Sequence, residues 1–318
     1  MKYIGVDLGG TNIAAGLVSE EGKILAQMST PTLVGRHYSE VMADMADVIL
    51  RLLEREGVGL DEIAYIGIGS PGAIDAEKGV VVFANNLYWH HVPVREELQK
   101  HIDKPVYIDN DANVAGLAEY KAGVSQGAAN SIFLTLGTGV GGGIIIGGRI
   151  YVGSHNVGAE LGHMIVSVNG RECTCGNKGC WETYTSATAL IKDGVAAAKA
   201  HPDSLIATSV GGDLSQITAK TVLDAVKAED PAALEVFDSY LEYMAMGIVS
   251  IINCFDPEII AIGGGVSKAG QWLIDKIAER VAMRVFYKDL PYAKIVLAQL
   301  GNDAGIIGAA MLGKQGVD

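Results

Sequence analysis

The sequence predicts an α/β protein with two related domains, because strand and helix patterns alternate along it and one stretch of the pattern repeats. The chain has 318 residues, which is long for one hydrophobic core and sufficient for two. Hydrophobic residues make up 49% of it and charged residues 19%, a composition typical of a folded globular protein. Its 41 glycines gather in a few short runs, which indicates tight loops lined by backbone.

The first part of the chain alternates between strand and helix patterns. Apolar runs separated by turn signals predict strands at residues 3–8, 12–19, 23–29, 63–70 and 106–109. Apolar residues at helical spacing predict helices at residues 39–56, 94–101 and 112–122. This alternation favours strands and helices packed in layers over an all-helical or all-strand fold.

The same pattern restarts at Asn130. Residues 4–11 (IGVDLGGT) align with residues 132–139 (IFLTLGTG) at a constant offset of 128 positions. After an insertion that contains three cysteines, the second copy continues with predicted strands at 258–262 and 295–299 and helices at 271–282 and 304–312. A duplication of this kind predicts two related domains that face each other across a cleft.

Charge and hydropathy exclude several classes of protein. The net charge is −13, which disfavours nucleic-acid binding because phosphate neutralisation needs clustered Lys and Arg. No window reaches the ~20 apolar residues of a membrane span. The N-terminus enters a strand at once, without the pattern of a signal peptide. We therefore expect a cytoplasmic protein that binds neither nucleic acid nor membrane, in a compartment where disulfides are disfavoured.

Three glycine-rich loops are candidates for holding phosphate groups, because glycine lets backbone N–H groups approach an anion closely. Their residues are Asp7, Gly9, Gly10, Thr11 and Asn12; Gly137, Thr138 and Gly139; and Gly263, Gly264 and Gly265. Each loop alone also fits a tight turn, whereas two matched copies and a third run favour phosphate binding. Asp7 would repel a phosphate unless a divalent cation lay between them, so we expect Asp7 on the Mg²⁺ side, through water.

A cluster of cysteines with one histidine predicts a metal site. The ligands would be His163, Cys173, Cys175 and Cys180, the residue types that zinc prefers. The alternative is a set of ordinary buried thiols, although Gly176 and Gly179 are placed to make the turns between ligands. Four protein ligands complete a tetrahedron, so this zinc would hold structure and would not activate water. Cys254, within an apolar helical pattern, is expected to be an unrelated core cysteine.

Eight motifs stand in order along the chain: DLGGT, GSPG, NNLYW, DNDAN, LGTGVGGG, GAELGH, CTCGNKGCWE and IGGGVS. This set covers essentially the whole chain and resembles the ROK family of sugar kinases, most nearly its bacterial ATP-dependent glucokinases. The resemblance implies two ribonuclease-H-like domains of the actin and hexokinase superfamily, flanking a central cleft that holds ATP and sugar. We expect a small α/β domain at 1–115, completed by a C-terminal helix at 302–318, and a large domain with the zinc-binding insertion at 116–301.

The resemblance also implies the residues of a sugar site. It assigns Asp111 as the general base that accepts the proton of the attacking sugar hydroxyl. The residues placed at the sugar are Gly72, Asn86, Asn110, Asp111, Glu160, His163 and Glu182. The residues themselves leave other roles open, because Asp109 or Asp111 could cap the following helix and Asn86 could be a turn residue. We further expect one nitrogen of His163 to bind zinc and the other to bond a sugar hydroxyl.

These expectations amount to Mg²⁺- and ATP-dependent phosphorylation of the 6-hydroxyl of glucose, with zinc as a structural ion. Kinases for fructose, mannose or N-acetylhexosamines would use the same residues, and ADP or polyphosphate could replace ATP as donor. A sugar-sensing ROK repressor would need a helix-turn-helix ahead of Asp7. An Hsp70-like or actin-like ATPase would not need Glu160, His163 and Glu182. The family also implies a homodimer or homotetramer.

Overall fold

The computed structural model describes residues 1–315, which form two compact units. The first unit comprises Met1–Phe133, Gly143–Ala159 and the described residues from Ala298 onward, and the second comprises Leu134–Gly142 and Glu160–Leu297. The sequence placed a domain boundary after residue 115, which lies inside helix α3 (Asp111–Ala122) of the first unit. That division stays a prediction, and the last three residues of its C-terminal helix lie outside the described residues.

The first unit is built on a five-stranded sheet with the order β3-β2-β1-β4-β8. The strands are β1 (Lys2–Leu8), β2 (Asn12–Val18), β3 (Ile24–Pro31), β4 (Ile63–Ser70) and β8 (Val106–Asn110). Strand β1 is antiparallel to β2 and parallel to β4, which is parallel to β8. In this register Asp7 pairs with Gly69 and Gly69 pairs with Asp109, so the two aspartates lie level with each other near the C-terminal ends of their strands.

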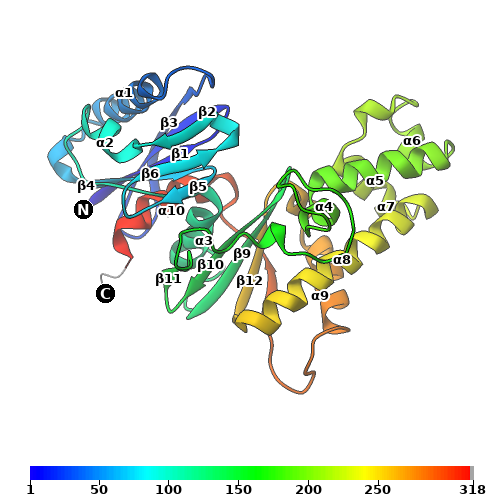
Figure 1. Cartoon of the computed structure of the whole chain (residues 1–318). Coiled ribbons are helices and arrows are strands. Elements are labelled where there is room, and N and C mark those ends of the chain that lie inside the picture. The colour runs from blue at the N-terminus through cyan, green and yellow to red at the C-terminus, as the bar shows by residue number, and fades with distance from the viewer. Residues whose placement is uncertain (316–318) are drawn as a thin grey trace. The chain divides into compact units, whose positions relative to one another are not determined.

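Helices cover both faces of this sheet (Figure 1). Helices α1 (Tyr38–Glu56) and α2 (Val94–Gln99) pack on one face, and α3 and α10 (Ala304–Met311) pack on the other. Strand β1 alternates accordingly, because Ile4 and Val6 belong to the core under α1, whereas Tyr3 belongs to the core under α10. The two helix layers therefore match the alternation along this buried strand, which places successive side chains on opposite faces of the sheet.

Helix α10 approaches the sheet so closely that only glycine fits beneath it. A Cβ atom at Gly5 would lie 1.9 Å from the carbonyl oxygen of Ile306, and one at Gly67 would lie 1.8 Å from that of Ala309. On the other side of the helix, a Cβ at Gly308 would lie 1.8 Å from the carbonyl oxygen of Val114 in α3. These glycines set the distance between α10 and its neighbours.

A small second sheet in the first unit was missing from the sequence prediction. Its strands, in the order β5-β6-β7, are β5 (Ala73–Asp75), β6 (Val80–Ala84) and β7 (Trp89–Val92). A 3-10 turn, Asn85–Leu87, joins the last two strands and contains Asn86. Strands of three to five residues are too short to establish a period in the sequence, which explains the omission.

The other five-stranded sheet repeats the topology of the first, with the order β11-β10-β9-β12-β13. Its strands are β9 (Asn130–Leu136), β10 (Val140–Ile146), β11 (Arg149–Ile150), β12 (Ile259–Gly263) and β13 (Lys294–Leu297). Strands β9 and β10 begin and end 128 positions after β1 and β2. The structure therefore confirms the internal duplication and the α/β class.

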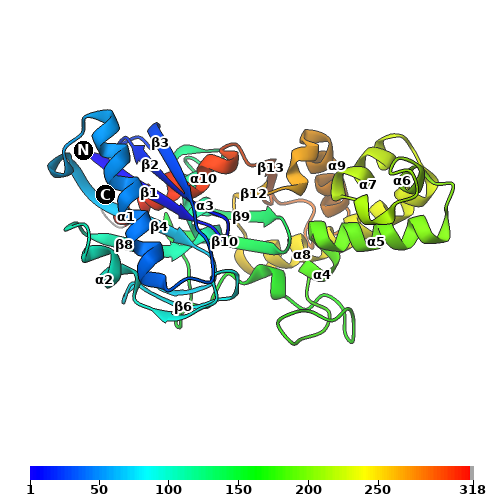
Figure 2. The ribbon, with the colours of Figure 1, turned by 90° about the horizontal axis from the view of Figure 1, so that it is seen from above.

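A group of helices lies in the second unit (Figure 2). They are α4 (Glu182–Thr185), α5 (Ala187–Ala200), α6 (Leu205–Thr208), α7 (Ala219–Lys227), α8 (Pro231–Phe255) and α9 (Gln271–Ala282). The expectation that Cys254 is a core residue was wrong, because its thiol is exposed. Helix α8 buries the stripe that contains Ile248, Ile251 and Ile252, and Cys254 falls outside that stripe. Within residues 1–315, no helix is long and apolar enough to cross a membrane.

The junction of β8 and α3 holds a buried carboxylate, Asp109, which is 7% exposed. Its Oδ1 accepts hydrogen bonds from the side-chain amide of Asn113 at 2.9 Å and from the backbone N–H of Asn110 at 2.7 Å. Desolvation by burial raises the pKa of Asp109, and these two hydrogen bonds offset part of that effect. Asp109 therefore supports the junction of β8 and α3, where burial makes its charged form less favourable.

Replacing Gly67 by alanine should destabilise the first unit, because the new methyl group would overlap the backbone of α10. Overpacking of this kind costs about 1–3 kcal/mol, which chemical denaturation measures. Gly265→Ala is the matched control, because a Cβ there would lie 3.9 Å from its nearest neighbour, the carbonyl oxygen of Leu136. Equal stability of Gly67→Ala and the parent protein would contradict the close approach of α10.

The raised pKa of Asp109 makes a prediction about pH. A raised pKa in the folded state favours folding below the ordinary carboxyl pKa, and this contribution is lost as pH rises through the raised value. Asp109→Asn keeps an oxygen acceptor without the charge. The stability of this variant relative to the parent should therefore increase between pH 4 and pH 7. Denaturation at both pH values tests this, with the exposed Asp103→Asn as control; a relative stability that does not change with pH would refute it.

Candidate functional site

The first glycine loop closes the hairpin of β1 and β2 and is held by Thr32, which is fully buried. The hydroxyl of Thr32 donates to the carbonyl of Gly9 at 2.7 Å, and its backbone N–H donates to the carbonyl of Thr11 at 2.8 Å. A Cβ at Gly10 would lie 3.4 Å from the carbonyl oxygen of Asn86, so the loop runs beside the Asn85–Leu87 turn. Buried hydrogen bonds thus fix the conformation of this loop.

Asp7 stands at the entrance to that loop, with its carboxylate against the start of α10. A Cβ at Gly305 would lie 2.7 Å from the carboxylate carbon of Asp7. Desolvation by burial raises the pKa of Asp7, because the charged carboxylate loses contact with water. A carboxylate in such a place gains from a divalent cation nearby, which agrees with the expected Mg²⁺ side of the loop.

Asn110 and Asp111 stand where β8 passes into α3. The Oδ1 of Asn110 accepts from the backbone N–H groups of Ala112 and Asn113, at 2.9 and 3.3 Å, so Asn110 is the N-cap residue. Its Nδ2 donates to the carbonyl of Gly72 at 3.0 Å. Gly72 has φ +103°, and a Cβ there would lie 2.1 Å from the carbonyl oxygen of Phe83. Asp111 is exposed, and its Oδ1 accepts from the amide of Ala112 at 2.8 Å.

In the second unit His163 and three cysteines come together. The ligand atoms of His163, Cys173, Cys175 and Cys180 all lie within 4.8 Å of one another. The Sγ atoms of Cys175 and Cys180 are 3.6 Å apart, and Sγ of Cys173 lies 3.7 Å from Nδ1 of His163. Zinc–sulfur bonds of ~2.3 Å in a tetrahedron require sulfur atoms about 3.7 Å apart. The four residues therefore fit zinc, with Nδ1 as the histidine ligand.

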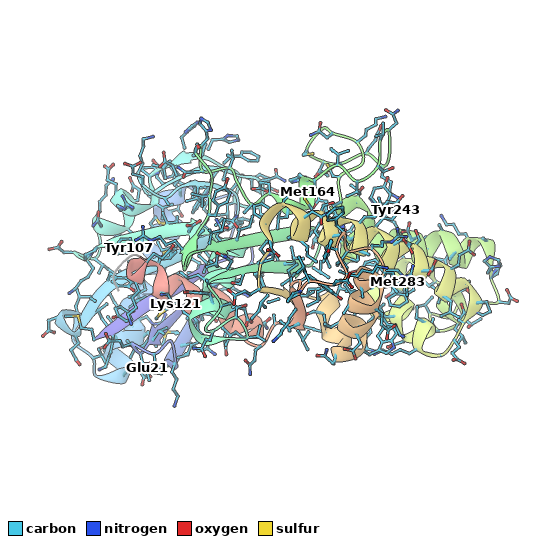
Figure 3. The ribbon with its side chains drawn as sticks, turned by 90° about the horizontal axis from the view of Figure 1, so that it is seen from below. Glu21, Tyr107, Lys121, Met164, Tyr243 and Met283 are labelled. Atoms are coloured by element: carbon cyan, nitrogen blue, oxygen red, sulfur yellow. The ribbon has the colours of Figure 1, made fainter. Side chains whose placement is uncertain are left out.

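The C-terminal end of this cysteine segment is anchored on α8 by Trp181. The indole ring is fully buried, and its Nε1 donates to the carbonyl of Tyr243 at 2.7 Å. A Cβ at Gly247 would lie 2.1 Å from the ring, so the helix approaches it closely. The backbone N–H of Trp181 donates to the carbonyl of Met164 at 2.8 Å (Met164 and Tyr243 are labelled in Figure 3). Both ends of the segment are thus tied together.

Glu182 follows Trp181 and touches two parts of the second unit. Its Oε1 lies 3.1 Å from Sγ of Cys173 and 3.7 Å from Nδ1 of His163. Its Oε2 accepts from the backbone N–H of Val140 at 3.4 Å, at the end of the second glycine loop. The segment that carries His163 also reaches this loop, because a Cβ at Gly162 would lie 2.1 Å from the carbonyl oxygen of Val140. Glu160, whose carbonyl accepts from the N–H of His163 at 3.0 Å, is exposed.

The third glycine loop packs against the base of the second. Gly264 has φ +85°, and a Cβ there would lie 2.5 Å from the backbone nitrogen of Leu136. The hydroxyl of Ser267 donates to the carbonyl of Gly264 at 2.8 Å and is largely buried. Leu136 is the last residue of β9, so the two loops lie side by side at the ends of adjacent strands.

The start of α5 holds the second glycine loop through contacts that sequence reasoning missed. The backbone N–H of Ala187 donates to the carbonyl of Gly137 at 2.8 Å, and the hydroxyl of Thr188 donates to the carbonyl of Thr138 at 2.7 Å. A threonine in the first turn of a helix has no distinctive sequence pattern, so nothing along the chain pointed to this partner.

Each unit thus assembles its own set of the expected site residues. The first unit holds Asp7, Gly9, Gly10, Thr11, Asn12, Gly72, Asn86, Asn110 and Asp111. The second unit holds Gly137, Thr138, Gly139, Glu160, His163, Cys173, Cys175, Cys180, Glu182, Gly263, Gly264 and Gly265. Their roles toward sugar, nucleotide and metal stay predictions.

Comparison with known proteins identifies the family. The sequence profile of the ROK family matches residues 3–316. A glucokinase of Thermotoga maritima is 40% identical, over 99% of this chain and 98% of that protein. An N-acetylgalactosamine kinase of a Shewanella species is 30% identical, over 98% of this chain and 96% of that protein. The crystal structure of a ROK glucokinase from Streptomyces griseus, with glucose and AMPPNP, matches with a TM-score of 0.81 at 36% identity, covering 98% of this chain and 99% of that one. The chain therefore belongs to the ROK family.

Proposed function

We propose that this protein is an ATP-dependent glucokinase, which transfers the γ-phosphoryl group of ATP to the 6-hydroxyl of glucose. Its ROK relatives named glucokinase align with it over nearly their whole length. The geometric observation that supports the proposal best lies within the first unit. The exposed carboxylate of Asp111 follows β8 directly, at the sheet edge where β1 delivers Asp7 and the first glycine loop.

In this reaction Asp111 accepts the proton of the attacking hydroxyl as that oxygen bonds to phosphorus. Asp7 serves the Mg²⁺ ion that accompanies ATP, through a water molecule. The backbone N–H groups of the three glycine loops bind the phosphate groups, which needs no lysine of the Walker type. Most of the rate enhancement comes from positioning and charge neutralisation, since the protein does little covalent chemistry in phosphoryl transfer.

The sugar is held by hydrogen bonds to its ring hydroxyls. The proposed partners are Asn86, Asn110, Glu160, His163 and Glu182, with Gly72 fixing Asn110. Sites built to bond each hydroxyl reject sugars that lack one, so these residues decide the choice between glucose and other hexoses. A kinase for fructose, mannose or an N-acetylhexosamine is the alternative, and the similarity to an N-acetylgalactosamine kinase makes it worth testing.

Zinc bound by three thiolates and one imidazole carries a net charge of −1 and is a poor electrophile, so its proposed role is structural. With Nδ1 of His163 on the metal, Nε2 is available to bond a sugar hydroxyl in a fixed tautomer. We also propose a cytoplasmic location and a homodimer or homotetramer, as the family implies.

A coupled assay of ATP consumption over a panel of hexoses tests the function. Glucose should give the highest kcat/KM, and Asp111→Ala should lower kcat by about 10²- to 10⁴-fold, because the general base is lost. Asp103→Ala, at an exposed loop position, is the matched control and should keep full activity. If no hexose stimulates ATP consumption, the proposal of an ATP-dependent kinase fails; preference for another hexose would overturn glucose alone.

Metal analysis of the purified protein tests the zinc site. We expect about one zinc ion per chain, and Cys175→Ser should lose most of it together with thermal stability. Cys254→Ser, which removes the exposed thiol of α8, should keep the zinc. The structural role assigned to zinc also predicts a weaker affinity for glucose in Cys175→Ser. A variant that loses zinc and keeps its glucose affinity would disprove the link between metal and sugar.

A further inference from the structure

We propose that Thr188 is a positioning residue, which aims the backbone N–H groups of the second glycine loop at the phosphates of the nucleotide. This inference rests on the proposed function. It concerns a group that we call the loop clamp, formed by Glu182, Ala187 and Thr188. All three residues and the glycine loop belong to the second unit, so the argument needs no arrangement between the units.

The loop clamp contacts the second glycine loop and the residue that follows it at three points. Ala187 donates its backbone N–H to the carbonyl of Gly137 at 2.8 Å, and Thr188 donates its hydroxyl to the carbonyl of Thr138 at 2.7 Å. Glu182 accepts from the N–H of Val140 at 3.4 Å. Glycine-rich backbone loses more conformational entropy on ordering than other backbone does, so these external contacts add to the loop's own hydrogen bond from the N–H of Gly137 to the carbonyl of Gly139 at 3.0 Å.

The direction of these contacts decides where the loop can bind an anion. In a trans peptide the C=O of one residue and the N–H of the next point in opposite directions, and no cis peptide bond occurs in residues 1–315. Binding the carbonyls of Gly137 and Thr138 to α5 therefore turns the N–H groups of Thr138 and Gly139 away from α5. Two adjacent N–H groups on one side of a turn form an anion-binding concavity.

The two glycines match this arrangement. A Cβ at Gly137 would meet no described atom within 4 Å, so open space lies beside the loop there. A Cβ at Gly139 would lie 2.5 Å from Oε2 of Glu182, so the carboxylate of the loop clamp can reach Val140 only past a glycine. The absence of a side chain at Gly137 thus leaves room for a phosphate, and its absence at Gly139 leaves room for Glu182.

The loop clamp is itself held rigidly. Ser186 caps α5, with its hydroxyl oxygen accepting from the N–H of Ala189 at 3.1 Å, and the side chain is buried. The hydroxyl of Thr185 donates to the carbonyl of Trp181 at 2.8 Å. Residues 180–188 therefore run from a metal ligand through the buried Trp181 to Thr188 as one continuous, hydrogen-bonded stretch. The cysteine segment and the second glycine loop are therefore connected through this stretch.

Two variants at one position test the role of the Thr188 hydroxyl. Thr188→Val removes the donor and keeps the shape, and it should lower kcat/KM for ATP about tenfold while KM for glucose and zinc content stay within about twofold. Thr188→Ser keeps the donor and should retain kcat/KM for ATP within about threefold. Thr208→Val is the matched control, because that hydroxyl donates to the carbonyl of Ser204, the N-cap residue of α6, at 2.9 Å. This variant should leave the kinetics unchanged.

A measurement without turnover separates this inference from the proposed function. In Thr188→Val, hydrogen exchange should accelerate in the peptide that spans Gly137–Val140, and affinity for a non-hydrolysable ATP analogue should fall about tenfold. If the parent protein phosphorylates no hexose, the proposed function fails, while these two measurements still decide the loop clamp. Unchanged nucleotide affinity in Thr188→Val, or equal losses in the valine and serine variants, would overturn the role assigned to the hydroxyl.

Discussion

Both units depend on direct contact between backbone segments, which is possible only where glycine has no Cβ atom. In the first unit the carbonyls of α10 lie directly on Gly5 and Gly67, and in the second Gly264 lies directly on Leu136. A methyl group at any of these positions would overlap backbone atoms, which cannot move aside as a side chain can. The high glycine content is therefore used in packing as much as in the loops.

The same constraint joins the cysteine segment to the second glycine loop. Gly162 packs on the carbonyl of Val140, and Gly139 leaves room for the carboxylate of Glu182. The metal cluster, the acidic side chain and the glycine loop are consequently neighbours within one unit, although they are far apart in sequence. A metal ion at this cluster would fix the segment from which the second glycine loop is held.

The sequence predicted most regular elements and the grouping of the metal ligands, because these depend on local patterns and on the ligand types themselves. It did not predict the strands β5 to β7, which are too short for a period, or the exposed position of Cys254. The contacts of Thr188 and the burial of Asp109 arise from tertiary packing. Asp109 also shows what a sequence motif leaves open, since DNDAN contains two acidic residues and the sequence does not distinguish their environments.

The structure distinguishes these two acids on physical grounds. Asp109 is buried and its Oδ1 is occupied by two N–H donors, so it is poorly placed to take a proton from a substrate. Asp111 is exposed at the first turn of α3, where the helix N-terminus favours a negative charge. A base for phosphoryl transfer must reach the substrate hydroxyl and be ionised before the proton moves. Exposure lets Asp111 meet the first condition and burial denies it to Asp109, which supports Asp111 as the proposed base.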